Sequence, residues 1–291
     1  MKTFNKIILT IISAVTASFA ANAADNGIVR WGNEAADTLR LNAMLVEAAN
    51  LRPARPGEYV AWFGEKFLGT PYKAHTLEHT PEQLTVNLDS LDCTTFAETA
   101  LALAITAQER RWSWRDFIYN LRRIRYRHGS VDGYGSRLHY ICDWALDNTA
   151  RGNFSEVTNR FPKVNYVVKT ISFMSENADK YPALADSATL AKIKNVEIGY
   201  RNHRYPFIKS IDTAEKATRA EFRQGDIVAF TSALKNLDVT HMGIIMVRDG
   251  APYVMHASLS AGKVLVSEVP LDKFLKRNRS FTGVRVFRIT E

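Results

Sequence analysis

The order of two hydrophobic periodicities along this 291-residue chain constrains its fold more than any other feature. In the first half, apolar residues recur every three or four positions, which predicts helices at 34–51, 58–68, 93–107, 115–126 and 137–148. After residue 222 they alternate between short turns rich in Gly or Asn, which predicts strands at 226–230, 241–247, 253–257, 264–269 and 282–289. Helices followed by an antiparallel sheet predict an α+β fold.

The segment between residues 110 and 222 separates these two parts. Besides the two helices already named, it contains one more predicted helix at 183–194 within irregular polar sequence. The chain has no repeats and no low-complexity linker. We therefore predict a single domain over residues 24–291, with a helical insertion at about 110–222.

The first 23 residues have the pattern of a secretory signal peptide. Lys2 and Lys6 give a basic start, the run Ile7–Phe19 is mostly apolar, and Ala21–Ala23 fits a cleavage site after Ala23. A membrane anchor is the alternative, but a transmembrane helix needs about 20 apolar residues. The pattern predicts a periplasmic or secreted protein that is not inserted in the membrane after cleavage.

The chain is basic, which bears on its partners. Its formal net charge of +8 falls to +6 when Lys2 and Lys6 are removed with the signal peptide. Outside the cytoplasm nucleic acid is scarce, so the charge favours anionic partners such as cell-wall polymer or lipid headgroups and predicts no nucleic-acid binding. A basic surface that is merely solvated remains the alternative.

Two cysteines are present, Cys93 and Cys142. Disulfides persist in an exported protein, so one interpretation joins the two and makes Cys93 inert. Their surroundings differ, however. Cys142 shares an apolar helical face with Leu138, Ile141 and Ala145, which is typical of a core cysteine.

Cys93 follows Asp92 where an extended segment at Leu84–Leu88 gives way to a helix. Asp is a favoured N-cap, and this places Cys93 at the first helical position. The positive end of the helix dipole is expected to lower the pKa of a thiol there, and the local N–H groups can stabilise an oxyanion. A small buried side chain at a helix start is the alternative.

A nucleophilic cysteine needs a base and a group that orients the base. His241 and His256 lie on neighbouring predicted strands, and Asp249–Gly250 is a suitable hairpin turn between them. Such a hairpin would bring the two imidazoles together. Gly243 would allow close approach of another backbone or of substrate.

A competing motif is the segment His75–His79, which reads H-x-x-E-H and matches a zinc-hydrolase pattern. Zinc binding would require both histidines on one face of a helix. Pro71 and Pro81 leave little room for that helix. We therefore predict an enzyme without metal or other cofactor.

Several motifs resemble the NlpC-type papain-like cell-wall cysteine peptidases. They are Leu91–Phe96, Gln224–Phe230, His241–Ile244 and His256–Ser258 with Gly262–Val264. The resemblance implies a papain-like core whose nucleophile helix packs on an antiparallel sheet or partial barrel. It also implies Cys93 as nucleophile, His241 as base, His256 as the orienting group and Tyr72 near the reacting carbon.

A branch described as N-acetylmuramoyl-L-alanine amidase-like is similar over most of the chain, notably at Phe67–Tyr72 and Arg137–Tyr140. The resemblance implies cleavage of an amide in the peptide stem of peptidoglycan through an acyl-enzyme. Around the substrate and oxyanion we expect Tyr72, Asp92, Arg137 and Ser258. Thr94 replaces the usual Ser after the cysteine, and the long insertion is a further departure.

Three functions remain open on the sequence. Muropeptide hydrolysis and acyl transfer to an amine share the first half-reaction, thioester formation. A non-catalytic wall-binding protein could keep the same fold. The bond that is cut, either muramoyl–L-Ala or a later stem bond, and the oligomeric state are equally open.

Overall fold

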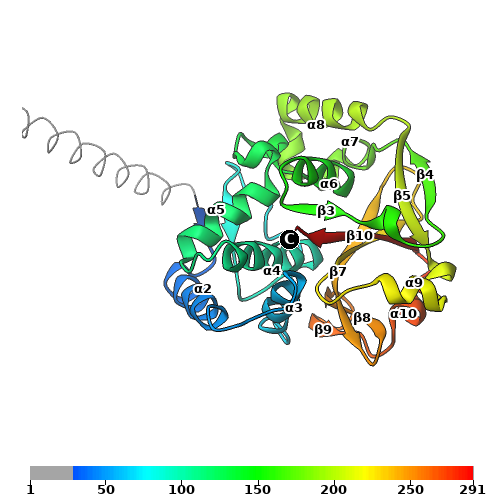
Figure 1. Cartoon of the computed structure of the whole chain (residues 1–291). Helices are drawn as coiled ribbons and strands as arrows, with labels where there is room; N and C mark the ends of the chain where they lie inside the picture. Colours follow the sequence, from blue (N-terminus) through cyan, green and yellow to red (C-terminus); the bar gives the residue numbers. More distant parts are fainter. Residues whose placement is uncertain (1–28, 291) are drawn as a thin grey trace, which may run out of the picture.

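The structure is a computed structural model that describes residues 29–290 (Figure 1). The expected signal peptide lies outside the described residues. The N-terminal helices gather on one side of a large antiparallel sheet, as the expected α+β fold requires. The helices of the N-terminal part are α2 (Glu34–Ala48), α3 (Gly57–Glu65), α4 (Cys93–Gln108) and α5 (Trp114–Arg125).

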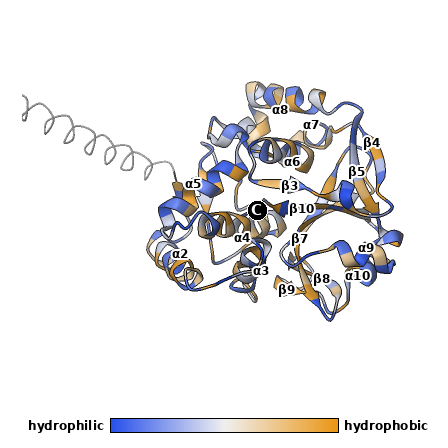
Figure 2. Cartoon of the chain, in the orientation of Figure 1, coloured by the Kyte–Doolittle hydropathy of each residue, from blue (hydrophilic) through white to orange (hydrophobic). Residues whose placement is uncertain are grey.

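The helix α4 is the centre of the helical layer. Every residue from Thr95 to Ala107 is buried, and nearly all are Ala, Leu, Ile, Thr or Phe. A helix that is apolar on all sides must be surrounded. Helices α2, α3 and α5 pack against α4, and so do two strands of the sheet. The surrounding helix α5 is amphipathic, with hydrophilic and hydrophobic residues both visible in Figure 2.

Two short strands precede the α4 helix in the chain. β1 (Val29–Trp31) and β2 (Leu84–Val86) form a parallel ladder. β2 is the extended segment expected upstream of Cys93, and it is buried throughout. It fixes the start of the loop that delivers Cys93 to the N-terminus of α4.

The large sheet has eight strands in the order β4-β5-β10-β6-β7-β8-β9, with β3 also paired to β10. All of its pairings are antiparallel. The strands from the C-terminal part are β6 (Ile227–Ser232), β7 (Val239–Arg248), β8 (Ala251–Ser258), β9 (Lys263–Val266) and β10 (Phe281–Ile289). The five strands expected there are all present, and the one expected over 264–269 ends at Val266.

The hairpin between β7 and β8 has the turn that the sequence predicts. Asp249 and Gly250 have φ angles of 49° and 72°, and Arg248 pairs with Ala251 across them. Two central residues with positive φ give a tight two-residue turn whose twist matches that of the strands. The turn therefore fixes the register of the two strands that carry His241 and His256.

The segment between residues 110 and 222 is not only helical as expected. Its later helices are α6 (Ile141–Ala150), α7 (Phe173–Glu176), α8 (Ser187–Gly199) and α9 (Lys216–Glu221). It also contributes strands β3 (Phe154–Glu156), β4 (Asn165–Lys169) and β5 (His203–Lys209) to the sheet. The insertion is therefore built into the sheet through β10 rather than appended to it.

Other boundaries differ modestly from expectation. The helix expected over 137–148 begins only at Ile141, because Arg137 is extended and bridges to Tyr126. The helix expected over 183–194 runs from 187 to 199, after a 3-10 turn at Pro182–Ala185. The helix α10 (Leu271–Arg277) was not expected.

Hydrophobic burial forms one large cluster and two smaller ones. The large cluster lies between the α2–α5 helices and the inner face of β6–β8. One smaller cluster lies on the other face of the sheet beneath α10, and the other is enclosed by α6–α8 and β5. Among residues 29–290, no helix is long and apolar enough to span a bilayer.

Candidate active site

Cys93 is the first residue of α4, as expected. The Asp92 carboxylate accepts a hydrogen bond from the Thr95 N–H at 2.8 Å, and the Thr95 hydroxyl accepts one from the Asp92 N–H at 2.9 Å. This capping box satisfies first-turn donors and fixes where the helix begins. Helix α4 packs against β7 and β8, the two strands that carry the histidines, and the Cys93 thiol lies near the backbone of Met242 on β7.

Cys93 is half-buried as a residue, and its thiol is free rather than in a disulfide. It lies near the Met242 N–H, the residue next to His241, and within 4.0 Å of the Thr94 hydroxyl. Burial of the sulfur, together with the nearby Asp92 carboxylate, raises its pKa to about 11. The expectation that the helix N-terminus would lower this pKa is therefore wrong for the resting protein, because desolvation outweighs the helix dipole.

The two histidine rings meet as the hairpin predicts. His241 Nε2 and His256 Nδ1 are 2.8 Å apart. Ile244 pairs with Met255, so the ladder places Gly243 beside His256 and His241 two residues further along the same face. A Cβ on Gly243 would lie 2.7 Å from Val254 and 3.4 Å from the His256 Cβ, so this position must be glycine for the strands to close around the pair.

Three phenylalanines surround the histidine pair. The ring centroid of Phe230 lies 5.5 Å from His241, that of Phe281 lies 5.9 Å from His241, and that of Phe274 lies 5.1 Å from His256. Burial lowers the pKa of His241 to about 3 and that of His256 to about 4. Both rings are therefore neutral near pH 7.

A neutral ring has one N–H and one lone pair, so one ring of the pair donates and the other accepts. If His241 Nε2–H donates to His256 Nδ1, the lone pair of His241 is on Nδ1 and is available to accept a proton. In this tautomer His256 fixes the orientation of the ring. The arrangement can act as a base oriented by a second residue.

Tyr72 lies beside the thiol. Its backbone bridges to Leu91, and its N–H donates to the Gly262 carbonyl at 2.8 Å, so it is tied both to the approach to Cys93 and to the loop before β9. Burial, and then the proximity of Cys93 and Asp92, raise the pKa of the Tyr72 phenol to about 12. Tyr72 therefore keeps its proton and can donate a hydrogen bond.

Two cavities flank this centre. One, of about 600 Å³, is lined by His241, His256 and Ser258, with Phe274 and Arg277 on its α10 side. The Ser258 hydroxyl accepts the Ala261 N–H at 3.2 Å and lies 3.1 Å from the Ser260 hydroxyl. The loop after β8 is thereby held against the histidines.

The other cavity, of about 220 Å³, lies on the far side of Cys93 and is lined by Asp92, Thr94 and Arg137. Arg137 is buried and donates to Glu78 at 2.8 Å and to the Leu77 carbonyl at 2.9 Å. The structure thus brings the expected residues to one region, with Ser258 and Arg137 on opposite sides of it.

The disulfide alternative is excluded, because both cysteines are free. Cys142 is a core residue as expected, fully buried in the cluster enclosed by α6–α8. Its sulfur accepts a hydrogen bond from Arg285 Nη1 at 3.2 Å.

The zinc alternative also fails on local structure. Residues 75–79 form a turn rather than a helix, with His75 at a φ of 60°. The Glu78 carboxylate accepts hydrogen bonds from Arg137 and from the Tyr134 hydroxyl, the latter at 2.9 Å. His79 Nε2 contacts the Thr76 carbonyl. Within residues 29–290 no cluster of His, Cys, Asp and Glu has a metal-binding arrangement.

Sequence reasoning missed the aromatic surroundings of the histidine pair. Phe274 lies on α10, and the signal for that helix is present: Pro270 is followed by apolar residues at 271, 274 and 275. Phe281 begins β10, two positions before Gly283, whose missing Cβ lets β5 approach. Their convergence on the histidine pair depends on strand order, which the sequence pattern does not contain.

Comparisons with known proteins assign the chain to a family. A family model described as AmiA-like, N-acetylmuramoyl-L-alanine amidase-like, matches residues 62–284. That range includes Tyr72, Cys93, His241 and His256 and spans more than half of the sequence. The chain belongs to the N-acetylmuramoyl-L-alanine amidase-like family. No match was found among curated protein sequences.

Three solved structures are similar to this chain, and one of them is an amidase by name. An N-acetylmuramoyl-L-alanine amidase from Bacteroides uniformis is 38% identical with a TM-score of 0.76, covering 81% of this chain and 99% of its own. A Bacteroides fragilis protein described as a candidate xylanase is 37% identical with a TM-score of 0.73, covering 78% and 100%. A Legionella pneumophila protein of family model DUF1460 is 18% identical with a TM-score of 0.67, covering 89% and 97%, and shares the fold alone.

Proposed function

We propose that this protein is an exported cysteine amidase that cuts the bond between the muramoyl lactyl group and L-alanine of peptidoglycan. The observation that carries the proposal is the 2.8 Å contact between His241 and His256 beside a cysteine at the start of α4. Membership of the amidase-like family supports peptidoglycan as the substrate. The papain-like relationship that the motifs imply is part of the same proposal.

The first half-reaction forms a thioester. The Cys93 sulfur attacks the amide carbonyl while His241 takes the thiol proton, so no charged pair is needed in the resting enzyme. This suits the raised pKa of the thiol and the lowered pKa of the imidazole. His241, now protonated, gives that proton to the leaving L-alanine nitrogen, and the C–N bond breaks.

The oxyanion is stabilised by donors around Cys93. The Cys93 N–H lies in the first helical turn and has no hydrogen-bond partner within the described residues. The Tyr72 phenol stays protonated because of its raised pKa and adds a second donor. Water, activated by His241, then attacks the thioester and restores the thiol.

Export is the second part of the proposal. It rests on the basic start, the apolar run and the Ala21–Ala23 site in the sequence, and on a substrate that lies outside the cytoplasm. The N-terminal residue of the protein recovered from the cell envelope tests it. We expect Ala24, and an intact Met1 on the envelope protein would contradict export by this route.

The two cysteines offer a matched test of the mechanism. We expect Cys93→Ala to lower the rate of muropeptide cleavage at least about a thousandfold, whereas Cys142→Ser leaves it near the wild-type rate. The serine can still accept from Arg285. Mass spectrometry should find peptide-free muramoyl sugar and peptides that begin with L-alanine.

The same experiment separates the alternatives. Undiminished cleavage by Cys93→Ala would contradict the cysteine mechanism. Sugars that retain part of the stem would assign the enzyme to a later bond. Binding of sacculi by the wild-type protein without any cleavage would favour a wall-binding protein, and products joined to an added amine would favour an acyltransferase.

A further inference from the structure

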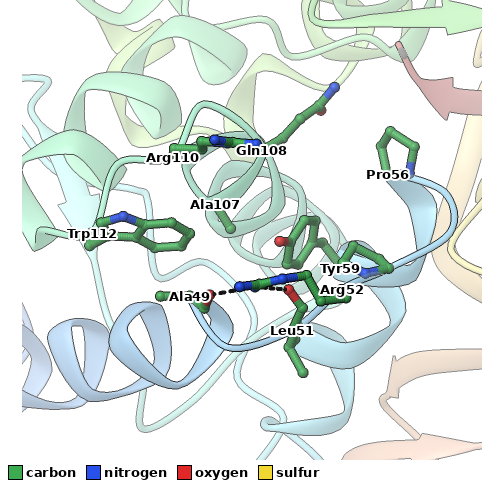
Figure 3. Close-up of a pocket in the computed structure, with 10 residues that line it drawn as sticks. Ala49, Leu51, Arg52, Pro56, Tyr59, Ala107, Gln108, Arg110 and Trp112 are labelled. Atoms are coloured by element: carbon green, nitrogen blue, oxygen red, sulfur yellow. Dashed lines mark hydrogen bonds between the residues drawn. The ribbon is translucent and has the colours of Figure 1, made fainter.

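A third cavity, of about 550 Å³, lies at the opposite end of α4 from Cys93 (Figure 3). Its lining comes from the loop between α2 and α3, from Tyr59 on α3, from the last turn of α4, and from the turn before α5. The first two of these precede residue 62, where the family match begins. We call this cavity the α4-end pocket; none of its residues belongs to the site described above.

Two aromatic side chains form the walls of the α4-end pocket. Figure 3 shows Trp112 and Tyr59 on opposite sides, with Ala107 between them. Both rings are only partly buried, while Ala107 is buried as part of the hydrophobic core. Aromatic faces bind the apolar C–H face of a saccharide ring and leave its hydroxyl groups in contact with water.

Two guanidinium groups add charge to the α4-end pocket, and no acidic residue lines it. Arg52 Nη1 donates to the carbonyls of Ala49 at 3.0 Å and Leu51 at 2.8 Å, which holds the side chain at the pocket and leaves its other donors available. The Arg110 side chain has no hydrogen bond or ion pair within residues 29–290. Two guanidinium groups with free N–H donors can bind a carboxylate through charge-assisted hydrogen bonds.

Arg110 also has a backbone conformation that an arginine rarely adopts. Its φ is 56°, and it follows the C-cap Glu109, a position that helices usually give to glycine. A side chain with a Cβ is disfavoured there on steric grounds. An arginine kept in the left-handed region at the rim of a cavity points to a role for its side chain.

We propose that the α4-end pocket binds a saccharide that carries a carboxylate, with Trp112 and Tyr59 against the ring and Arg52 and Arg110 on the charge. This inference rests on the proposed function. Hydrolysis of the muramoyl amide adds hydroxide to the acyl carbon and hydrogen to the nitrogen, so it leaves a lactyl carboxylate on the sugar. The occupant is therefore a peptide-free stretch of the glycan strand.

Binding can be measured on the wild-type protein, because the product sugar is no longer cleaved. The probe is the disaccharide of N-acetylglucosamine and N-acetylmuramic acid with a free lactyl group, and chitobiose is its neutral match. We expect calorimetry to give at least tenfold weaker binding for chitobiose. Arg110→Gly and Trp112→Ala should each weaken disaccharide binding about tenfold.

Two features of the design keep the test interpretable. Arg110→Gly removes the guanidinium and also the steric cost of the positive φ, so lost binding cannot come from unfolding. Arg111→Gln is the matched control, because Arg111 lies outside the pocket, 3.9 Å from Glu109 and Asp116. It should bind the disaccharide as the wild type does.

Equal binding of chitobiose would overturn the role of the carboxylate. Disaccharide binding that survives both Arg110→Gly and Trp112→Ala would overturn the location. Absence of disaccharide binding in a preparation with full Cys93-dependent cleavage would overturn the inference and leave the proposed function intact. Failure of the proposed function has a separate signature, which is absence of cleavage by the wild-type protein.

Discussion

At the scale of single residues, the environment of His241 and Cys93 determines their protonation. Burial disfavours charge on both groups, and the Asp92 carboxylate further disfavours a thiolate, so thiol and imidazole are neutral together. A substrate carbonyl must arrive before proton transfer becomes favourable. The proposed mechanism is therefore general-base catalysis on a neutral thiol rather than attack by a preformed thiolate.

The depressed histidine pKa values predict acid lability. The unfolded chain binds protons at its histidines below about pH 6.5, whereas folded His256 binds one only near pH 4. Their contribution to stability is complete above pH 6.5 and is lost as pH falls toward 4. We expect about 1.4 kcal/mol per pH unit for each histidine in this window, measured by denaturant unfolding.

The control for that prediction is His256→Asn. Its stability difference from wild type should shrink steadily as pH falls from 6.5 to 4. Both proteins contain the buried carboxyl groups of Glu82 and Glu98, whose raised pKa values change stability with pH in the opposite direction. Their effect therefore cancels in the difference between variant and wild type. A difference that is independent of pH would contradict the lowered pKa of His256.

His256 should also be replaceable in its orienting role. An asparagine places a polar atom at the δ position, where His256 Nδ1 contacts His241 Nε2, and alanine places none. We expect His256→Ala to lower kcat about 10- to 100-fold with KM little changed, and His256→Asn to recover part of the loss. Steady-state kinetics checks this, and equal rates for the two variants would contradict it.

Local chemistry at Asp92, Cys93, His241 and Gly243 could be predicted from sequence, because caps, hairpin turns and close strand contacts involve near neighbours in the chain. The direction of the Cys93 pKa shift could not. It depends on how completely the sulfur is desolvated by β7, and a sequence pattern carries no information about that burial.

At the scale of elements, the loop between β6 and β7 leads directly to His241. A side chain from the insertion holds this loop in place. Lys169 on β4 donates to three carbonyls, those of Ser232 at 2.5 Å, Leu234 at 2.6 Å and Leu237 at 2.9 Å. One ammonium group thus satisfies backbone acceptors that would otherwise need water. The insertion therefore supports the strand that carries the proposed base.

We expect Lys169→Met to lower the free energy of unfolding by about 2 kcal/mol, because charge-assisted hydrogen bonds to the loop are lost. Lys163→Met is the control, since the Lys163 ion pair with Glu215 is largely exposed, and it should leave the free energy of unfolding almost unchanged. Chemical denaturation measures both. Equal effects would mean that the loop does not depend on Lys169.

The strands of the insertion show where element prediction failed. β5 contains Pro206, which cannot donate to a ladder and argues against a strand. In the structure β5 pairs with β10 only at Ile208 and Lys209, so the missing donor at Pro206 is tolerated. Such a strand is recognisable only once its partners are known.

At the scale of the whole molecule, Arg285 on β10 joins the C-terminal sheet to the insertion. It forms two hydrogen bonds to Glu156 on β3, one to the Cys142 sulfur on α6, and a cation–π contact with Tyr205 on β5. The side chain is 2% exposed. The insertion and the sheet therefore share one buried centre and should unfold together.

We expect Arg285→Met to lower the unfolding free energy by about 3 to 5 kcal/mol, because Glu156 is left without its buried partner. Arg248→Met, at the exposed end of β7, should cost less than about 1 kcal/mol. Thermal unfolding followed by circular dichroism compares them. A separate early transition in the wild type would contradict joint unfolding of sheet and insertion.

The length and burial of α4 fix the spacing between its two ends. A 16-residue helix is about 24 Å long, and packing on all sides keeps it straight and fixed in place. The thiol lies at the N-terminal end of α4 and the α4-end pocket at its C-terminal end, so the helix sets a fixed distance between the two sites. Only a polymer can touch both ends at once, so intact wall should be retained between cuts while short soluble fragments diffuse away after each turnover.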